Sequence, residues 1–98
     1  MAKTITKELF LELVGENIKK WRFRKGWSQE KLGLEVGLTR MHISRIEKGY
    51  NITLTTILKL ALALDTKPES LIKVKFGKSS NTLEGLVEQS KANKSKEK

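Results

Sequence analysis

The chain has 98 residues, including 20 lysine or arginine and 11 aspartate or glutamate side chains, so its formal net charge is +9 and its isoelectric point is about 9.9. This length allows one small domain, the lack of cysteine excludes disulfides and thiolate metal sites, and no apolar run is long enough to span a membrane. The N-terminus also lacks a secretory signal, so we expect a cytoplasmic protein whose positive charge favours a polyanionic partner.

The first predicted helix covers residues 7–25, with Thr6 as its N-cap and Gly26 after its last turn. Gly15 weakens this pattern, so the continuity of the helix is left open. The inward-facing apolar side chains recur at helical intervals at Phe10, Leu13 or Val14, Ile18 and Trp21.

The end of this helix, at 19–25, carries five cations in seven residues. Helical geometry spreads them around the axis, so most of the run is expected to be a solvated surface above a buried Trp21. The pattern leaves open whether Phe23 is buried as well. Trp27, which follows the helix, is expected to enter the core.

A short amphipathic helix is predicted behind Ser28, whose hydroxyl caps the free backbone donors at a helix start. Leu32 and Val36 lie one turn apart, so both face inward. Gly33 is small where a neighbouring helix must approach closely, and Gly37 takes the left-handed conformation that reverses the chain.

A second short helix is predicted over residues 40–48, with Thr39 as its N-cap and Gly49 closing it. Ile43 and Ile46 recur three residues apart and face inward. The outward side is then formed by Arg40, Met41, His42, Ser44 and Arg45. Two short helices joined by a tight turn form a helix-turn-helix, which offers its second helix to the major groove of DNA.

A further helix is predicted after the loop 50–52, from the N-cap Thr53 to about Leu64. It carries more apolar residues than one narrow stripe holds, namely Ile57, Leu58, Leu60, Ala61, Leu62 and Leu64. We therefore expect it to be covered on two sides, by the domain core and by a partner subunit.

A last helix of the domain is predicted to begin at Pro68, after Thr66 or Lys67. Thr66 and Glu69 have the spacing of a capping box. The apolar surface continues, in the form of an extended arm, through Leu71, Ile72, Val74 and Phe76.

The composition changes after Gly77 to serine, asparagine and lysine. A short helix is predicted at 82–89, and the last residues are expected to be solvated and mobile. We therefore divide the chain into a helix-turn-helix DNA-binding and dimerisation domain at 1–77 and a partly disordered C-terminal extension at 78–98.

The segment 15–72 resembles the phage-repressor and Cro-like helix-turn-helix domains. The matching residues are Gln29, Leu32, Gly33, Gly37, Ile43, Ile46 and Glu47-Lys48-Gly49, and the sequence at 54–72 is similar to the fourth and fifth helices of that family. The resemblance implies an all-α fold, a compact five-helix repressor-like domain with a helix-turn-helix, here with an N-terminal helix extension and a flexible C-terminal tail. Gly33 stands where the family usually has alanine, which weakens the helix by about 1 kcal/mol.

The predicted base contacts are outward side chains of the second helix, namely Arg40, Met41, Ser44 and Arg45. Arg40 lies in the first turn, from which a guanidinium reaches the paired acceptors of guanine, and Arg45 lies on the same outward side. Met41 either packs on a thymine methyl group or fills a gap near the core. Ser44 suits a phosphate or water-mediated contact.

The predicted phosphate contacts are Gln29, Thr39, His42, Tyr50 and Asn51. The resemblance implies that Gln29 clamps a phosphate and that Tyr50 and Asn51 lie along the sugar-phosphate strand, although Tyr50 is also suited to packing on the domain. His42 is the only histidine, so a role facing the groove or a phosphate is favoured over a metal site, and no metal or cofactor is expected. The resemblance also implies a structural pair, Arg22 with Glu47, that fixes the pose of the second helix.

These features predict a sequence-specific DNA-binding transcriptional regulator that acts as a homodimer on a palindromic operator and reads the major groove with helix 39–48. One short helix makes few base contacts, so a second copy is needed for discrimination. The expected dimer interface uses the fourth and fifth helices around Leu60, Leu64, Leu71, Ile72, Val74 and Phe76. A restriction-modification controller protein, a phage-type repressor and an antitoxin are compatible subtypes.

The main alternative is an antitoxin or other protein-interaction module that keeps the fold without reading DNA. Such a module predicts acidic or apolar residues on the outer face of the second helix, where this chain has Arg40, His42 and Arg45. An enzyme is not expected, because the chain has one histidine, one aspartate, no cysteine and no phosphate-cradling loop.

Overall fold

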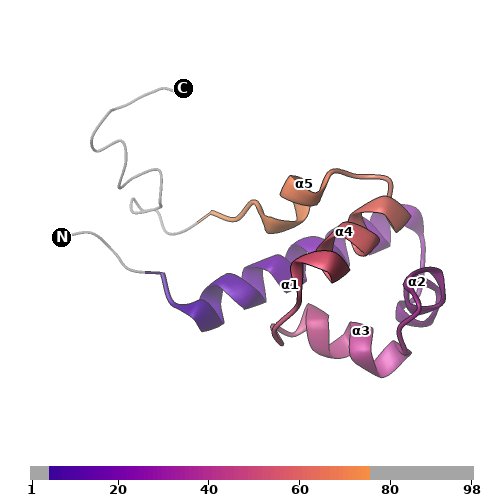
Figure 1. Cartoon of the computed structure of the whole chain (residues 1–98), viewed down its shortest axis with the longest axis horizontal. Coiled ribbons are helices and arrows are strands. Elements are labelled where there is room, and N and C mark those ends of the chain that lie inside the picture. The colour runs from indigo at the N-terminus through magenta and orange to yellow at the C-terminus, as the bar shows by residue number, and fades with distance from the viewer. Residues whose placement is uncertain (1–4, 76–98) are drawn as a thin grey trace. The chain divides into compact units, whose positions relative to one another are not determined.

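The computed structural model describes residues 5–75, and these residues form an all-helical domain (Figure 1). Its helices are α1 (Lys7–Lys25), α2 (Gln29–Val36), α3 (Arg40–Glu47), α4 (Leu54–Ala63) and α5 (Pro68–Ile72). Within this part of the chain no helix combines the length and apolar character needed to cross a membrane. Phe76, the helix predicted at 82–89 and the extension predicted at 78–98 lie outside the described residues.

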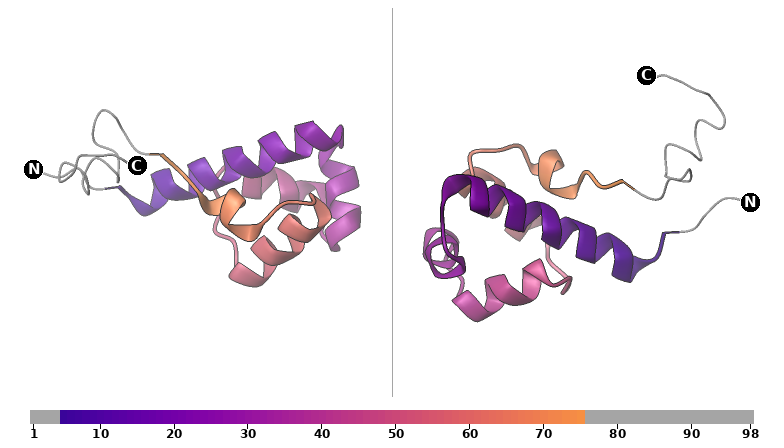
Figure 2. Two further views of the ribbon diagram at one scale, coloured as in Figure 1. Left: turned by 90° about the horizontal axis from the view of Figure 1, so that it is seen from above. Right: turned by 180° about the vertical axis from the view of Figure 1, so that it is seen from behind.

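The long helix α1 makes its main contacts with two of the other helices. It packs against α3 on one side and α5 on the other, as two views of the ribbon show (Figures 1 and 2). α2 packs against α3 and α4, and α4 packs against α5. The predicted five-helix domain with a helix-turn-helix is confirmed, and α2 and α3 form that motif.

The core draws one or more apolar side chains from every helix, and it consists of Val14, Ile18, Leu32, Val36, Ile43, Ile46, Ile57, Leu60, Ala61, Leu64 and Leu71. Trp21 and Trp27, predicted to be buried and to enter the core, are half-buried and pack against it. Phe23 is 61% exposed, so it lies outside this core. Its position on α1, two residues from Trp21 and therefore on another side of the helix, accounts for the difference.

Gly15 allows α1 to lie directly on the last turn of α3. α1 is continuous through this residue, which settles the point that the pattern left open. A Cβ atom added at Gly15 would meet the carbonyl oxygen of Glu47 at 2.5 Å and that of Ile46 at 2.6 Å. Because a side chain cannot enter this space without moving backbone, glycine is required for the observed packing of the two helices.

Gly33 plays a similar part between α2 and the turn. A Cβ atom at Gly33 would meet the carbonyl oxygen of Leu38 at 2.4 Å, so the close neighbour is the backbone of the turn rather than the neighbouring helix that the pattern predicted. The amide of Leu38 also donates to the carbonyl oxygen of Gly33, with 2.8 Å between nitrogen and oxygen. Alanine at this position would force that turn to shift.

Side-chain caps determine where three of the helices begin. The hydroxyl groups of Ser28, Thr39 and Thr53 each accept a hydrogen bond from the backbone amide three residues ahead, at Lys31, His42 and Thr56. Such a bond satisfies one of the free donors at a helix start and stabilises it by about 1 kcal/mol. The predicted starts of α2, α3 and α4 therefore rest on local chemistry.

α5 begins at Pro68, as predicted, but without the predicted capping box. Lys67 is its N-cap and makes no side-chain capping bond, so Thr66 and Glu69 do not form the capping box that their spacing indicated. The start is defined by Pro68, whose fixed backbone angle suits the first helical position.

The predicted extended arm begins only at Lys73, because Leu71 and Ile72 belong to α5. A side chain of α1 holds this segment in place. The Asn17 amide nitrogen donates to the carbonyl oxygens of Leu71 and Lys73, at 2.9 Å and 2.8 Å. Val74 packs on the core. The segment is thus part of the domain rather than an arm that reaches away from it.

Candidate nucleic-acid interface

The outward side of α3 carries the side chains that were predicted to contact bases. Arg40, Met41 and Arg45 are exposed, and Ser44 is half-buried. The opposite side is anchored in the core by Ile43 and Ile46. Since successive residues of a helix are rotated by about 100°, this anchoring determines which side chains α3 presents to the surroundings.

The loop that leaves α3 is set by Gly49. Lys48 is the C-cap, and Gly49 follows it with a φ of 107°, a conformation that favours glycine. The amide of Gly49 donates to the carbonyl oxygen of Ile46 at 3.1 Å, and the amide of Tyr50 donates to that of Arg45 at 3.0 Å. This paired arrangement is the Schellman motif, which turns the chain so that Tyr50 lies beside the outward face of α3.

A surface pocket of about 340 Å³ collects most of the predicted contact residues. It is lined by Thr39, Met41, His42, Arg45, Tyr50 and Asn51, and we call it the Arg45 pocket. Among the described residues, none with a carboxylate lines it. The guanidinium carbon of Arg45 lies 5.9 Å from the centre of the Tyr50 ring, which is itself exposed. Cationic, hydroxyl and amide groups therefore meet at one concave surface.

Asn51 lines this pocket, and one of its two polar side-chain atoms is already hydrogen-bonded within the protein. Its side-chain oxygen accepts a hydrogen bond from the backbone amide of Ile52 at 2.9 Å. The amide nitrogen, a donor, is the group that remains for an acceptor such as a phosphate oxygen. Thr39 likewise uses its oxygen at the N-terminus of α3, where it caps the amide of His42.

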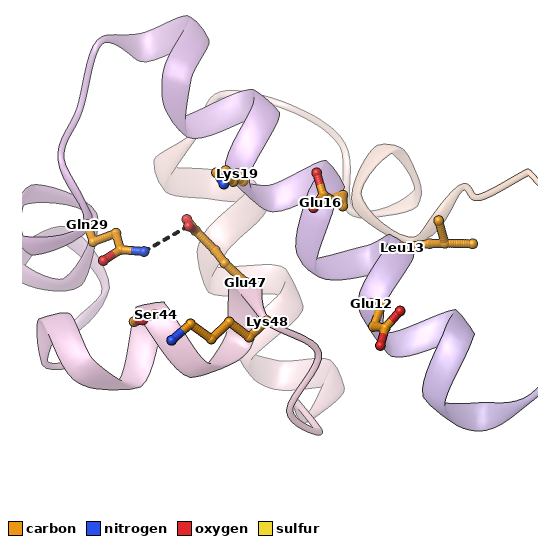
Figure 3. A pocket seen from close by; sticks show the side chains of 8 residues that line it. All are labelled: Glu12, Leu13, Glu16, Lys19, Gln29, Ser44, Glu47 and Lys48. Carbon is orange, nitrogen blue, oxygen red and sulfur yellow. Dashed lines mark hydrogen bonds between the residues drawn. The ribbon is translucent and has the colours of Figure 1, made fainter.

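A second pocket, of about 360 Å³, lies on the other side of α3 (Figure 3). We call it the Glu47 pocket, and its lining residues are Glu12, Leu13, Glu16, Lys19, Gln29, Ser44, Glu47 and Lys48. It contains the other two predicted contacts of this region, Gln29 and Ser44, whereas Arg40 lines neither of these two pockets. Glu12 and Glu16 come from α1 and were not singled out from the sequence.

The predicted structural pair lies beneath this second pocket. Arg22 donates from Nε to Oε2 of Glu47 at 2.6 Å and from Nη2 to Oε1 at 2.9 Å, and the two side chains are 7% and 3% exposed. Nη1 of Arg22 donates to the carbonyl oxygen of Trp27 at 2.9 Å. This two-bond geometry satisfies both charges and ties α1 to the end of α3.

Gln29 is also part of this network. Its amide nitrogen donates to Oε1 of Glu47 at 3.0 Å, a contact drawn in Figure 3. The sequence reasoning treated Gln29 as a phosphate contact alone and missed this bond. Gln29 and Glu47 are 18 residues apart, so no local pattern connects them.

The cationic end of α1 is covered with aromatic contacts that were not predicted. The Arg24 guanidinium lies 4.4 Å from the centre of the Trp21 ring, and the Lys25 amine lies 4.8 Å from that of Trp27. Lys25 also pairs with Asp65 at 2.7 Å. Some of the cations at 19–25 therefore interact with aromatic rings or with Asp65 of the same domain. None of them lines the Arg45 pocket.

A helix-turn-helix family model matches residues 18–71, which is more than half of the chain. The chain belongs to the helix-turn-helix family. The match spans the second part of α1 and all of α2, α3 and α4, so the first turns of α1 lie before it.

The chain is also similar to proteins with curated descriptions and to solved structures. The chain is 42% identical over 57 residues to a hypothetical transcription factor of Neisseria meningitidis, covering 57% of this chain and 54% of that protein, or about half of its length. The restriction-modification controller protein C.AhdI from Aeromonas hydrophila is 40% identical, covering 63% of this chain and 94% of its own, with a TM-score of 0.59. The P22 c2 repressor, solved in complex with a synthetic operator, is 32% identical over 62% and 94%, with a TM-score of 0.59.

The residues predicted for a dimer interface of this helix-turn-helix domain require correction. Leu60, Leu64 and Leu71 are fully buried in the core of the single chain, so they cannot form a contact with another copy. Leu54 is instead 81% exposed and Leu62 is 67% exposed, on the side of α4 that faces away from the core. Of the other residues predicted for this interface, Ile72 is 39% exposed, Val74 is half-buried and Phe76 lies outside the described residues.

Proposed function

We propose that this protein is a sequence-specific DNA-binding transcriptional regulator that inserts α3 into the major groove. The observation that carries the proposal is the Arg45 pocket, a concave surface of cationic, hydroxyl and amide groups on a helix anchored by Ile43 and Ile46. A phosphate-lined groove needs such a surface, because a carboxylate at the same place would repel it. The proposal makes the chain a binding protein rather than an enzyme.

The relatives support this function and one subtype of it. C.AhdI is named as a restriction-modification controller, and the P22 c2 repressor was solved with an operator. The chain matches 94% of each of these two. We therefore propose regulation by occupancy of an operator, with a controller protein as the favoured subtype.

The proposed contacts are of two kinds: contacts to bases, which read the DNA sequence, and contacts to phosphates, which position the protein on the DNA. Arg40 and Arg45 are long, exposed and cationic, which suits hydrogen bonds to the two acceptors of guanine. Met41 is exposed on the same helix and lines the Arg45 pocket, where a thymine methyl group would find an apolar neighbour.

Phosphate contacts are assigned to residues at both ends of α3 and at the start of α2. Thr39 and His42 lie at the N-terminus of α3, whose free amides and dipole favour an anion. Tyr50 and Asn51 follow the helix, and Gln29 begins α2. Ser44, which was predicted as a base contact, lines the Glu47 pocket together with Gln29 and does not line the Arg45 pocket.

We further propose that the protein acts as a homodimer on a palindromic operator. Leu54, Leu58 and Leu62 recur every four residues along the exposed side of α4, and they form an apolar stripe on the surface. Leu54 also lines a small apolar groove together with Ile72 at the end of α5. Two copies meeting through this stripe would bury it and double the number of base contacts.

The function is tested by selecting bound sites from a random duplex library with the full-length protein. We expect an enriched consensus with two-fold symmetry and a half-site spacing of about one helical turn. Absence of enrichment, with equal binding to all duplexes or to none, would overturn the proposed function. A consensus without symmetry would retain DNA reading and reject the homodimer.

The dimer surface is tested by Leu58→Glu, measured by sedimentation equilibrium. A charge in the middle of the apolar stripe should weaken dimerisation by about tenfold or more, because the carboxylate would lose its water on association. Leu34→Glu is the matched control, since Leu34 is an exposed leucine on α2, away from the stripe. Equal self-association of both variants and the wild type would move the interface elsewhere.

A further inference from the structure

We infer that Gln29 is a positioning residue for the reading helix α3, in addition to the phosphate contact that the proposed function assigns to it. The inference rests on that proposed function. It starts from the bond between the Gln29 amide nitrogen and Oε1 of Glu47, at 3.0 Å. Glu47 is the last residue of α3, two positions after Arg45.

The carboxylate of Glu47 is a point where three elements of the fold meet. It is almost completely buried, so its charge has to be compensated by donors from the protein. Arg22 supplies two of them from α1, at 2.6 Å and 2.9 Å, and Gln29 supplies another from the start of α2. Oε1 accepts from both partners, so Gln29 completes the set of donors to a buried anion.

Gln29 itself is held in place at the edge of the surface. It is the first residue of α2, directly after Ser28, whose hydroxyl caps the amide of Lys31 at 3.0 Å. Its side chain is half-buried and extends across the Glu47 pocket toward α3 (Figure 3). Ser44 and Lys48 line the same pocket, and because Gln29 is half-buried, its amide lies between the surface and the buried carboxylate of Glu47.

One amide group has enough hydrogen-bonding capacity for both roles. The nitrogen of glutamine carries two hydrogen atoms, of which the bond to Glu47 uses one. The second is available to a phosphate oxygen on the outer side. Because Arg22 compensates the charge of Glu47, the carboxylate does not present a net negative charge to that phosphate.

The consequence is a link between backbone contact and base reading. A phosphate held by Gln29 is connected through Glu47 to the end of α3, so the position of the DNA strand and the pose of the reading helix depend on each other. A residue that only contacts phosphate weakens binding to all sequences alike. Loss of Gln29 should weaken binding to all sequences and should also lower the discrimination between the operator and other duplexes.

The test compares Gln29→Met with Asn51→Ala in the full-length protein. Methionine has nearly the same length and shape as glutamine but donates no hydrogen bond. Asn51 is an assigned phosphate contact, and its side-chain oxygen accepts a hydrogen bond from the neighbouring amide of Ile52. The measured quantity is the ratio of affinities for the selected operator and for a scrambled duplex of equal length. We expect Gln29→Met to lower this ratio by about fivefold, and Asn51→Ala to weaken both affinities and leave the ratio unchanged.

A second readout needs no DNA. Amide hydrogen exchange at Lys48, Gly49 and Tyr50, the end of α3, should be faster by severalfold in Gln29→Met than in the wild type and unchanged in Asn51→Ala. Gln29→Asn gives an independent variant that keeps the polar amide but is one carbon too short to reach both partners. We expect it to lower the affinity ratio as Gln29→Met does.

The outcomes separate this inference from the proposed function. If the wild type binds operator and scrambled duplex equally, the proposed function fails. If the wild type discriminates but Gln29→Met and Gln29→Asn both keep its affinity ratio and its exchange rates, Gln29 is a phosphate contact only and the inference is overturned.

Discussion

The two pockets on either side of α3 differ in what holds their side chains. The Arg45 pocket is lined by exposed residues with no carboxylate among the described ones, whereas the Glu47 pocket is built around a buried ion pair and also carries Glu12 and Glu16. One side of the helix thus presents exposed side chains without a carboxylate, and the other is held by a buried ion pair. The buried ion pair restrains the end of α3, and this restraint fixes the groups that the other side of the helix presents.

The largest effect is expected from breaking the restrained side. Glu47→Ala leaves Arg22 buried without its partner, which should lower the free energy of unfolding by about 3–5 kcal/mol. Chemical denaturation of the full-length protein measures this change. Glu35→Ala is the control, because the exposed pair of Lys31 and Glu35 should contribute less than about 1 kcal/mol. If both variants lost a similar free energy of unfolding, the buried pair would contribute no more to stability than an exposed pair.

A smaller effect is expected on the available side. Arg45→Ala should weaken operator binding by about 1–3 kcal/mol and relax the preference at one base position, since a guanidinium that reads guanine is lost. Fluorescence anisotropy with the selected operator and its single-base variants measures both quantities. Arg24→Ala removes the same charge from α1, outside both pockets, and should change affinity little and base preference not at all. Equal effects of the two variants would mean that Arg45 acts only through net charge.

The smallest effect concerns the acidic wall of the Glu47 pocket. Glu12 and Glu16 lie one turn apart on α1, opposite Gln29, Ser44 and Lys48 (Figure 3). A phosphate strand at Gln29 would meet their charge, so the double variant Glu12→Gln with Glu16→Gln should bind random duplex about twofold to fivefold more tightly at low salt. Titrations at two salt concentrations test this.

The control for the acidic wall is an equal change of charge elsewhere. Glu30→Gln with Glu69→Gln removes two carboxylates from exposed positions on α2 and α5 that line neither pocket. This control should increase the affinity less than the Glu12 and Glu16 variant does. If it increases the affinity as much, the position of the acidic wall has no influence beyond net charge.

Much of the helix-turn-helix was predictable because its signals are local. Ser28, Thr39 and Thr53 cap helices through bonds to amides three residues ahead, and such bonds depend only on residue type and spacing. The outward face of α3 followed from the spacing of Ile43 and Ile46. The pairing of Arg22 with Glu47 was reached only through a family resemblance, since nothing in the spacing alone joins residues so far apart.

Other features were decided only by tertiary packing. α4 has apolar residues around most of its circumference, so periodicity did not reveal that Leu60 and Leu64 face the core while Leu58 and Leu62 face outward. Gly15 looked like a weak point in a helix, and only the approach of the α3 carbonyl groups shows why glycine is needed there. The bond from Gln29 to Glu47 likewise exists only in the folded chain.

The sequence by itself thus determined the helices, their starts and the side chains that α3 presents, because caps and periodicity act within a few residues along the chain. The tertiary structure decided which apolar stripe is covered, where two backbones touch and what holds Gln29. These three features depend on distances between segments that are remote in sequence. Such distances are set only when the helices pack, so the spacing of residues along the chain does not reveal them.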